Sequence, residues 1–160
     1  MKNILWILLI FSNLALAQKF VSEYPSGPTA SITPGELCDR PARYRYPENI
    51  GYCERDVPTE IKDEVFAAYR KLGFRLTEST RSSYKIDHFI SLCAGGSNNK
   101  ENLWPQHLSI SAITDNIEKL GCDKMAQGKI TQAKFVILLK RVKTDLSQAS
   151  LVTKELAALR

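Results

Sequence analysis

The residues best suited to chemistry lie in one short segment of the chain, from Tyr84 to His107. The segment holds both histidines of the sequence, one acidic residue beside the first of them, several amides and a Gly-Gly turn: Asp87, His88, Gly95, Gly96, Asn98, Asn99, Asn102, Gln106 and His107. Phosphodiester hydrolysis requires a base that deprotonates water and a cation that neutralises the charge growing on the phosphate. A neutral imidazole titrates near working pH, and a carboxylate is the hard oxygen ligand that Mg²⁺ prefers. The segment therefore holds residue types that metal-assisted phosphodiester hydrolysis requires.

The order of these residues resembles the HNH endonuclease superfamily. Three stretches carry the resemblance: Ile86-Asp87-His88-Phe89-Ile90-Ser91-Leu92, Gly95-Gly96-Ser97-Asn98 and Asn102-Leu103-Trp104-Pro105-Gln106. They are similar to small bacterial members that read Asp-His-x-Ile-Pro-Leu, Gly-Gly-Ser-Asn and Asn-Leu-Trp-Pro-Gln. The resemblance implies a ββα-metal core, in which two short strands and a helix hold one divalent cation. With the flanking helices and the disulfide-held N-terminal arm predicted below, the expected fold class is α+β.

The resemblance also implies roles for individual residues. It makes His88 the general base that activates water and Asp87 a ligand of the cation, which we expect to be Mg²⁺, with Mn²⁺ or Zn²⁺ as alternatives. Asn102 matches the middle Asn of the superfamily name. Its amide is expected to hold the loop and to keep the His88 ring aimed at the water.

The position of a further metal ligand differs from the family pattern. The superfamily places its final ligand on the helix, where this chain has Ser111. We favour His107, which follows the second short strand directly and could reach the cation from the junction between strand and helix. Asp115 is the alternative, with Asn116 behind it.

Two further features of the motif concern its backbone. Ser91 stands where the family usually has Pro, which shapes the strand end and does no chemistry. Neighbouring residues on a regular strand face opposite sides, whereas the resemblance requires Asp87 and His88 to address one site. The strand is therefore expected to end, twist or bulge there.

Other residues near the motif have simpler expected roles. Trp104 is expected to pack in the core beneath the site, because its large apolar surface is better buried. Gly95 and Gly96 are expected to serve backbone geometry. Three basic residues could contact phosphates, but we favour solvated surface charge for each: Arg81, Lys85 and Lys100.

Periodicity predicts the elements around the motif. Apolar residues recur at helical spacing over 58–72, 111–126, 131–143 and 150–159, with Gly73 and Gly128 placed to end the first two helices and Thr131 to cap the third. Alternation predicts a strand within 83–92, and Leu103-Trp104 begins a second strand that Pro105 keeps short.

The first 17 residues have the features of a secretory signal peptide. Lys2 precedes an apolar run, and Leu14-Ala15-Leu16-Ala17 ends in a small-x-small cleavage site. The run is interrupted by Ser12-Asn13 and is shorter than the roughly 20 residues of a membrane span. Gln18 follows the cleavage site where a lipoprotein has Cys. We expect a secreted or periplasmic mature protein that begins at Gln18 and has no membrane anchor.

The mature chain is expected to form one domain of 143 residues. Residues 18–57 are rich in Pro, Gly, Ser and Tyr without sustained periodicity and are predicted to form an extended arm, whereas residues 58–160 form the HNH-like nuclease domain. Cleavage removes one Lys and no acid, so the formal charge falls from +5 to +4. This charge favours a polyanionic partner but is shared by many proteins that bind no nucleic acid.

Four cysteines are present, Cys38, Cys53, Cys93 and Cys122. An even number in an exported protein predicts disulfides, and three pairings are open. We favour Cys38–Cys53, which closes a local loop in the arm, and Cys93–Cys122, which joins the motif segment to a later helix. No Cys-x-x-Cys pair is present, which argues against a zinc ribbon.

Together these features favour a monomeric, exported endonuclease that contacts DNA or RNA through the phosphate backbone. Two alternatives remain open. A cysteine hydrolase would use Cys93 as its nucleophile, a histidine as base and Asn102 as the orienting residue. A non-catalytic binding or effector module would have kept the ββα shell without the activity.

Overall fold

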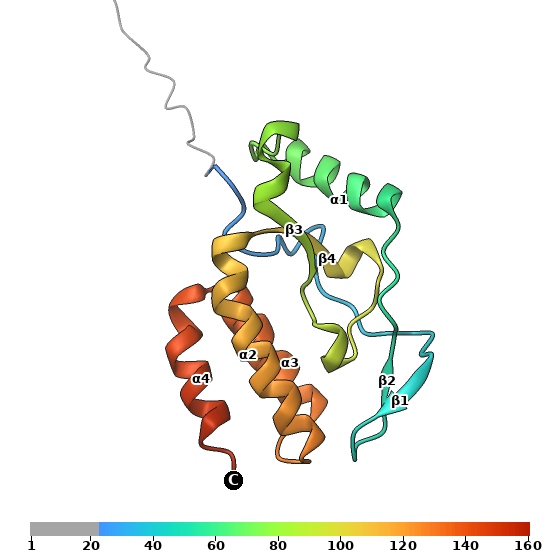
Figure 1. Cartoon of the computed structure of the whole chain (residues 1–160), viewed down its shortest axis with the longest axis vertical. Coiled ribbons are helices and arrows are strands. Elements are labelled where there is room, and N and C mark those ends of the chain that lie inside the picture. Colours follow the sequence, from blue (N-terminus) through green and yellow to red (C-terminus); the bar gives the residue numbers. More distant parts are fainter. Residues whose placement is uncertain (1–22) are drawn as a thin grey trace, which may run out of the picture.

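A computed structural model describes residues 23–160 of the chain (Figure 1). The predicted signal peptide and its cleavage site lie outside the described residues. The elements follow in the order β1 (Arg43–Arg45), β2 (Ile50–Tyr52), α1 (Thr59–Lys71), β3 (Tyr84–His88), β4 (Leu103–His107), α2 (Leu108–Ala126), α3 (Gln132–Thr144) and α4 (Ala149–Ala157), with short 3-10 helices at Glu78–Ser83, Leu92–Ala94, Lys100–Asn102 and Leu146–Gln148. The fold is therefore α+β, as the sequence predicts.

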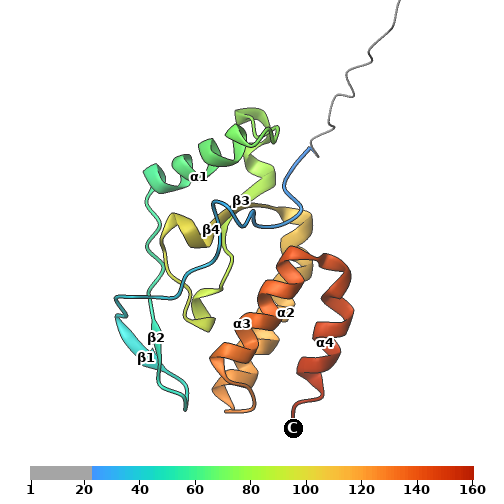
Figure 2. The same cartoon turned by 180° about the vertical axis from the view of Figure 1, so that it is seen from behind.

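The two strand pairs and the helices occupy different parts of the molecule. In both views α2, α3 and α4 run side by side along one flank (Figures 1 and 2). Helix α1 lies at the end of the molecule opposite the C-terminus. The β1–β2 hairpin of the arm lies on the side of β3–β4 away from α4. The motif hairpin is thus placed between the three-helix layer, α1 and the arm.

The predicted helices are all present, and their ends match the expected signals. Gly73 adopts φ +94° after α1 and donates its N–H to the carbonyl of Arg70. The Thr131 side chain accepts a hydrogen bond from the N–H of Lys134 and caps α3. The clearest difference is the start of α2 at Leu108, three residues earlier than predicted.

The β3–β4 hairpin differs from its prediction in the length of its second strand. The antiparallel register runs from Tyr84 opposite His107 to His88 opposite Leu103. β3 lies within the predicted 83–92 and ends at His88, and β4 continues through Pro105, which was predicted to limit it. In a two-stranded sheet every second residue of a strand points its N–H away from the partner, so a proline can occupy such a position without losing a ladder bond.

The arm contains a hairpin that the sequence did not predict and is bonded to the motif loop. Tyr46 and Asn49 adopt φ +64° and +58° in the β1–β2 turn. Just before β1, the N–H of Cys38 donates to the carbonyl of Gly95, and the carbonyl of Glu36 accepts from the N–H of Ser97. The arm therefore forms one side of the loop that follows β3.

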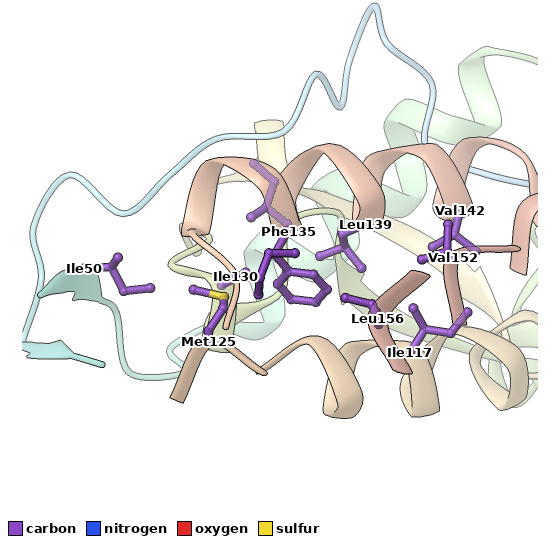
Figure 3. Packing of buried hydrophobic residues seen from close by; sticks show 11 residues of the cluster. Ile50, Ile117, Met125, Ile130, Phe135, Leu139, Val142, Val152 and Leu156 are labelled. Carbon is purple, nitrogen blue, oxygen red and sulfur yellow. The ribbon is translucent and has the colours of Figure 1, made fainter. Parts of the chain in front are cut away.

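Two apolar clusters pack on either side of the motif hairpin. The first joins α2, α3 and α4 to the hairpin of the arm through Ile50, Ile90, Ala94, Ile117, Met125, Ile130, Phe135, Leu139, Val142, Val152 and Leu156 (Figure 3). The second joins α1 to β3, β4 and α2 through Val57, Val65, Phe66, Tyr69, Leu76, Ile86, Leu103, Trp104 and Ile110. Trp104 is fully buried in this second cluster, as predicted.

The cysteines pair as predicted, Cys38 with Cys53 and Cys93 with Cys122, and the described chain has no free thiol. Both bridges fit an oxidising compartment outside the cytoplasm. No helix between residues 23 and 160 is long and apolar enough to cross a membrane.

Reduction of the bridges is expected to lower the free energy of unfolding, because each bridge restricts the unfolded chain. The expected loss is about 2–4 kcal/mol per bridge. Urea denaturation with and without reductant measures it, and the paired variants Cys38→Ser/Cys53→Ser and Cys93→Ser/Cys122→Ser separate the two bridges. Unchanged midpoints in both paired variants, or four alkylatable thiols by intact mass in the exported protein, would contradict this expectation.

Candidate active site

His88 lies at the end of β3 and is almost fully buried, with 3% of its surface exposed. Its Nε2 is 3.0 Å from Oδ1 of Asn98, whose Nδ2 donates to the carbonyl of Glu54 at 2.6 Å. A carbonyl can only accept, so Nδ2 of Asn98 faces Glu54 and Oδ1 faces the ring. The ring must then donate from Nε2. Nδ1 of His88 therefore carries the lone pair and is the atom that can take a proton.

The surroundings of His88 keep the imidazole neutral. Burial lowers its pKa from 6.5 to about 4, the Arg55 and Lys143 charges act in the same direction, and the Asn98 hydrogen bond and the Asp87 carboxylate oppose them. At neutral pH the ring is thus an unprotonated base.

Asn102 has a structural role in the loop that follows β3. Its side chain is fully buried, and Nδ2 donates to the carbonyls of Ile90 and Ser97, both at 2.9 Å. Its Oδ1 accepts from the N–H of Ile90 at 2.8 Å. The amide holds the loop as expected, but the contact that orients the His88 ring comes from Asn98. The sequence signal for that contact is the last residue of the Gly-Gly-Ser-Asn motif.

The turn between Ile90 and Asn102 needs its glycines for geometry. Gly95 adopts φ +81°, and a Cβ on Gly96 would lie 1.8 Å from the carbonyl oxygen of Ile90. Ser91 has φ −60°, the value that proline imposes. The position therefore keeps the backbone that the family's proline would give.

Asp87 is buried in an ion pair. Its Oδ2 lies 2.8 Å from Nζ of Lys143, and its Oδ1 lies 3.6 Å from Nζ of Lys85. Burial alone would raise the pKa of the Asp87 carboxyl, but the Lys143 and Lys85 ammonium groups outweigh burial and hold that pKa below its usual value. Asp87 is therefore a carboxylate whose two oxygens face cationic side chains.

Asp87 and His88 contact different parts of the protein. The ladder stays in register up to His88, where β3 ends, so no bulge turns the two side chains to one face. Asp87 meets Lys143 of α3, whereas His88 meets Asn98 of the loop. The strand ends where expected, yet the two motif side chains do not converge on one point.

His107 lies at the opposite end of the hairpin from His88. It pairs with Tyr84, three residues along β3 from Asp87, which corresponds to about 10 Å. Its Nδ1 accepts from the N–H of Ser109 and so caps α2, which explains why that helix starts early. Its ring stacks on Tyr24 with centroids 4.2 Å apart. The structure does not bring His107 to Asp87.

The other ligand candidates do not complete a divalent cation site with Asp87. Asp115 is exposed and accepts from Lys85 at 2.8 Å, Asn116 is exposed, and Ser111 donates to the carbonyl of Leu108. Over residues 23–160, no three His, Cys, Asp or Glu side chains are grouped so that they could hold a metal ion. In this arrangement the predicted ligands do not fit a metal, because cationic side chains already contact the Asp87 oxygens.

Arg55 is a candidate phosphate ligand that the motif did not single out. Its side chain is exposed at one end, while Nη2 donates to the carbonyl of Ile86 at 3.1 Å. Its charge acts on the His88 ring. An open depression of about 320 Å³ lies beside Asn98 and is lined by Asp39, Arg40, Cys53, Asp56, Ser97, Asn98 and Asn99.

The basic residues near the motif are already paired with carboxylates. Arg81 lies 3.3 Å from Asp63 and stacks over the Phe66 ring, and Lys100 lies 3.4 Å from Glu64. Lys85 pairs with Asp115. Arg55 is thus better placed than these three to meet a phosphate near His88.

Comparison of the chain with protein-family models, curated proteins and solved structures finds no match. What the site can do therefore follows from its own residues.

Proposed function

We propose that this protein is an exported endonuclease of the HNH type that hydrolyses phosphodiester bonds of DNA or RNA, with His88 as the general base. The observation that carries the proposal is the buried His88 ring, held through Nε2 by Asn98 and left with a free lone pair on Nδ1. The β3–β4 hairpin followed directly by α2 supports it, because a ββα-metal core has the same order of elements.

In the proposed reaction, Nδ1 of His88 accepts a proton from a water molecule whose oxygen bonds to the phosphorus, while one ester P–O bond breaks and the leaving oxygen takes a proton from solvent. The phosphate binds near the His88 ring, where the Arg55 guanidinium, whose charge acts on that ring, neutralises a non-bridging oxygen. The bound phosphate also raises the pKa of His88, because an anion beside the ring favours the imidazolium. The buried ring is therefore a stronger base when substrate is present than when it is absent.

The HNH resemblance implies a divalent cation, which would supply charge neutralisation at the phosphate when bound. Asp87 and His107 do not hold it together here, so the proposed steps rest on His88, Asn98 and Arg55. Nucleic acid is expected to bind through its phosphate backbone, which is common to DNA and RNA. Two disulfides fit export to the medium or periplasm, where the proposed enzyme acts as a monomer.

Activity on intact nucleic acid tests the proposal directly. Protein beginning at Gln18 and purified with its disulfides intact is incubated with circular plasmid and with structured RNA, in EDTA, Mg²⁺ or Mn²⁺. Internal cleavage that co-elutes with the protein on a sizing column supports the function. Intact substrates under all three conditions would reject it.

Arg55→Ala is expected to reduce kcat/KM for plasmid by roughly 10- to 100-fold, because a charge-assisted bond to phosphate is lost. Arg70→Ala makes the same change of net charge on exposed α1 and is the matched control. Initial rates at two salt concentrations measure both. Equal losses in the two variants would show that only net charge matters and would remove Arg55 from the site.

A second candidate function is a non-catalytic binding or effector module built on the same elements. The contact of Lys143 with Asp87 favours it, since an internal cation occupies one side of the motif. This candidate predicts nucleic acid binding without cleavage. A cysteine hydrolase is not supported, because Cys93 is bonded to Cys122.

A further inference from the structure

Lys143 is an unusual buried charge that the proposed reaction does not use. It lies near the C-terminal end of α3, and its side chain is fully buried. Lysine is almost never fully buried unless its charge is paired. The surroundings of this ammonium group therefore need a specific explanation.

Three oxygens from two elements, β3 and α2, surround the ammonium nitrogen. Nζ lies 2.8 Å from Oδ2 of Asp87 on β3, 2.6 Å from Oε1 of Glu118 on α2 and 2.5 Å from the carbonyl oxygen of His88. The ammonium group donates hydrogen bonds to Oδ2 of Asp87 and to the His88 carbonyl, and it forms an ion pair with Oε1 of Glu118. We call Asp87, Glu118 and the His88 carbonyl the oxygen cage.

The charges around the cage keep Lys143 ionised. Burial alone would lower its pKa, but Asp87 and Glu118 outweigh burial and raise it above its usual value. Lys85 lies 3.6 Å from Oδ1 of Asp87 and also pairs with Asp115, and His88 follows Asp87 on the strand. The oxygen cage thus places two acidic groups around one internal cation, the ammonium group of Lys143.

The same oxygens are the type that a hard divalent cation prefers. Two carboxylates and a backbone carbonyl are typical ligands of Mg²⁺, Mn²⁺ or Ca²⁺. The HNH resemblance expects a metal at Asp87, yet the structure has an ammonium group there. The Lys143 ammonium group carries one positive charge. Because it is covalently part of the protein, it cannot exchange with ions in solvent as a bound metal ion can.

We propose that Lys143 is the resident cation of the Asp87 site, and that its ammonium group takes the place which the HNH resemblance gives to a divalent metal. Asp87 is then the counter-ion of Lys143. The ion pairs of Lys143 with Asp87 and Glu118 connect α3 to β3 and α2. The bond from Lys143 to the His88 carbonyl makes Lys143 a positioning residue for the end of β3. This inference stands on the cage geometry and does not depend on nuclease activity.

Titration with MnCl₂ tests the proposal on the mature protein with its disulfides intact. Isothermal calorimetry and the electron paramagnetic resonance signal of free Mn²⁺ both report binding. Wild type and Asp87→Asn are expected to give the same isotherm, because Asp87 does not hold Mn²⁺ in the presence of Lys143. Lys143→Met removes the charge and keeps an unbranched side chain. It is expected to gain Mn²⁺ affinity on the order of 100-fold, since the positive charge that occupies the oxygen cage and repels a second cation is removed.

Two controls define the site of the gained affinity. Lys143→Met/Asp87→Asn should lose the gain, and Lys134→Met, at an exposed position of α3, should bind as wild type does. Wild-type binding of Mn²⁺ that Asp87→Asn abolishes would overturn the proposal. A folded Lys143→Met without any gain would overturn it as well.

Folding of the variant provides a second measurement. If Lys143→Met is unfolded without metal, recovery of its native circular dichroism on addition of Mn²⁺ supports the proposal, and failure to recover at millimolar Mn²⁺ overturns it. Failure of the nuclease assay leaves these binding results unchanged. The two proposals can therefore fail separately.

Discussion

Replacement of His88 by glutamine is expected to slow cleavage of nucleic acid by about 10²- to 10⁴-fold, which is the usual contribution of a general base. Glutamine can still donate a hydrogen bond to Oδ1 of Asn98 but cannot take a proton from water. Circular dichroism and sizing verify that the variant is folded. Initial rates on plasmid and RNA then measure the loss.

The pH dependence of the same reaction gives an independent measure of the base. Because burial lowers the pKa of His88 to about 4, kcat/KM of wild type should rise with pH through about 4 and remain level at neutral pH. The direction follows from the need for a neutral ring, which predominates above the pKa. An ordinary exposed histidine would place this rise near 6.5.

His107→Gln is the matched control for the loss of a histidine. His107 caps α2 and stacks on Tyr24, away from the proposed base, so its variant should retain the rate within a few-fold. Wild-type rates in His88→Gln, with contaminating nuclease excluded by co-elution, would contradict the role of His88. Similar losses in both histidine variants would contradict the separation of the two sites.

Asp87→Ala is expected to lower the free energy of unfolding by about 3–5 kcal/mol, the usual cost of removing one partner of a buried ion pair. The truncation leaves the ammonium group of Lys143 with Glu118 as its remaining carboxylate. The motif alone suggests little loss of fold, because a metal ligand usually sits in a polar site that tolerates truncation. The ion pair with Lys143 reverses that expectation.

Urea denaturation of three variants distinguishes the contribution of the buried ion pair to the free energy of unfolding from that of a surface ion pair. Asp115→Ala removes an exposed partner of Lys85 and should cost at most about 1 kcal/mol. Asp87→Ala/Lys143→Met should recover part of the stability lost in Asp87→Ala, because neither charge is then left alone. Equal midpoints for Asp87→Ala and Asp115→Ala would show that the pair contributes no more than a surface contact.

The sequence predicted the helices well because their signals are local. Apolar periodicity predicted the central parts of α1, α2 and α3. Gly73, Gly128 and Thr131 predicted helix ends that the structure shows. The start of α2 at Leu108 was missed because the helix was predicted from its apolar spacing, whereas the cap that starts it is the side chain of His107. The disulfide pairing was predicted correctly from the spacing of the cysteines and the elements around them.

Features that depend on contacts between distant parts of the sequence could not be predicted from local patterns. The β1–β2 hairpin has strands of three residues and a turn in which non-glycine residues adopt positive φ, so neither alternation nor a glycine signal marks it. Lys143 reads as one more basic residue in the last turn of an amphipathic helix, although it meets Asp87 across 56 positions of sequence. Asn98 was within the motif, but only its contact with Glu54 shows which side of the His88 ring it holds.

The hydrogen bond between Asn98 and the Glu54 carbonyl couples the proposed base to the oxidation state of the arm. Glu54 follows Cys53 directly, so the bridge to Cys38 anchors the peptide that fixes the orientation of Asn98. In the reducing cytoplasm that anchor is absent, and the ring loses the support that aims it. For the proposed nuclease, this coupling predicts that Cys38→Ser/Cys53→Ser cleaves more slowly than Cys93→Ser/Cys122→Ser, and equal rates would contradict it.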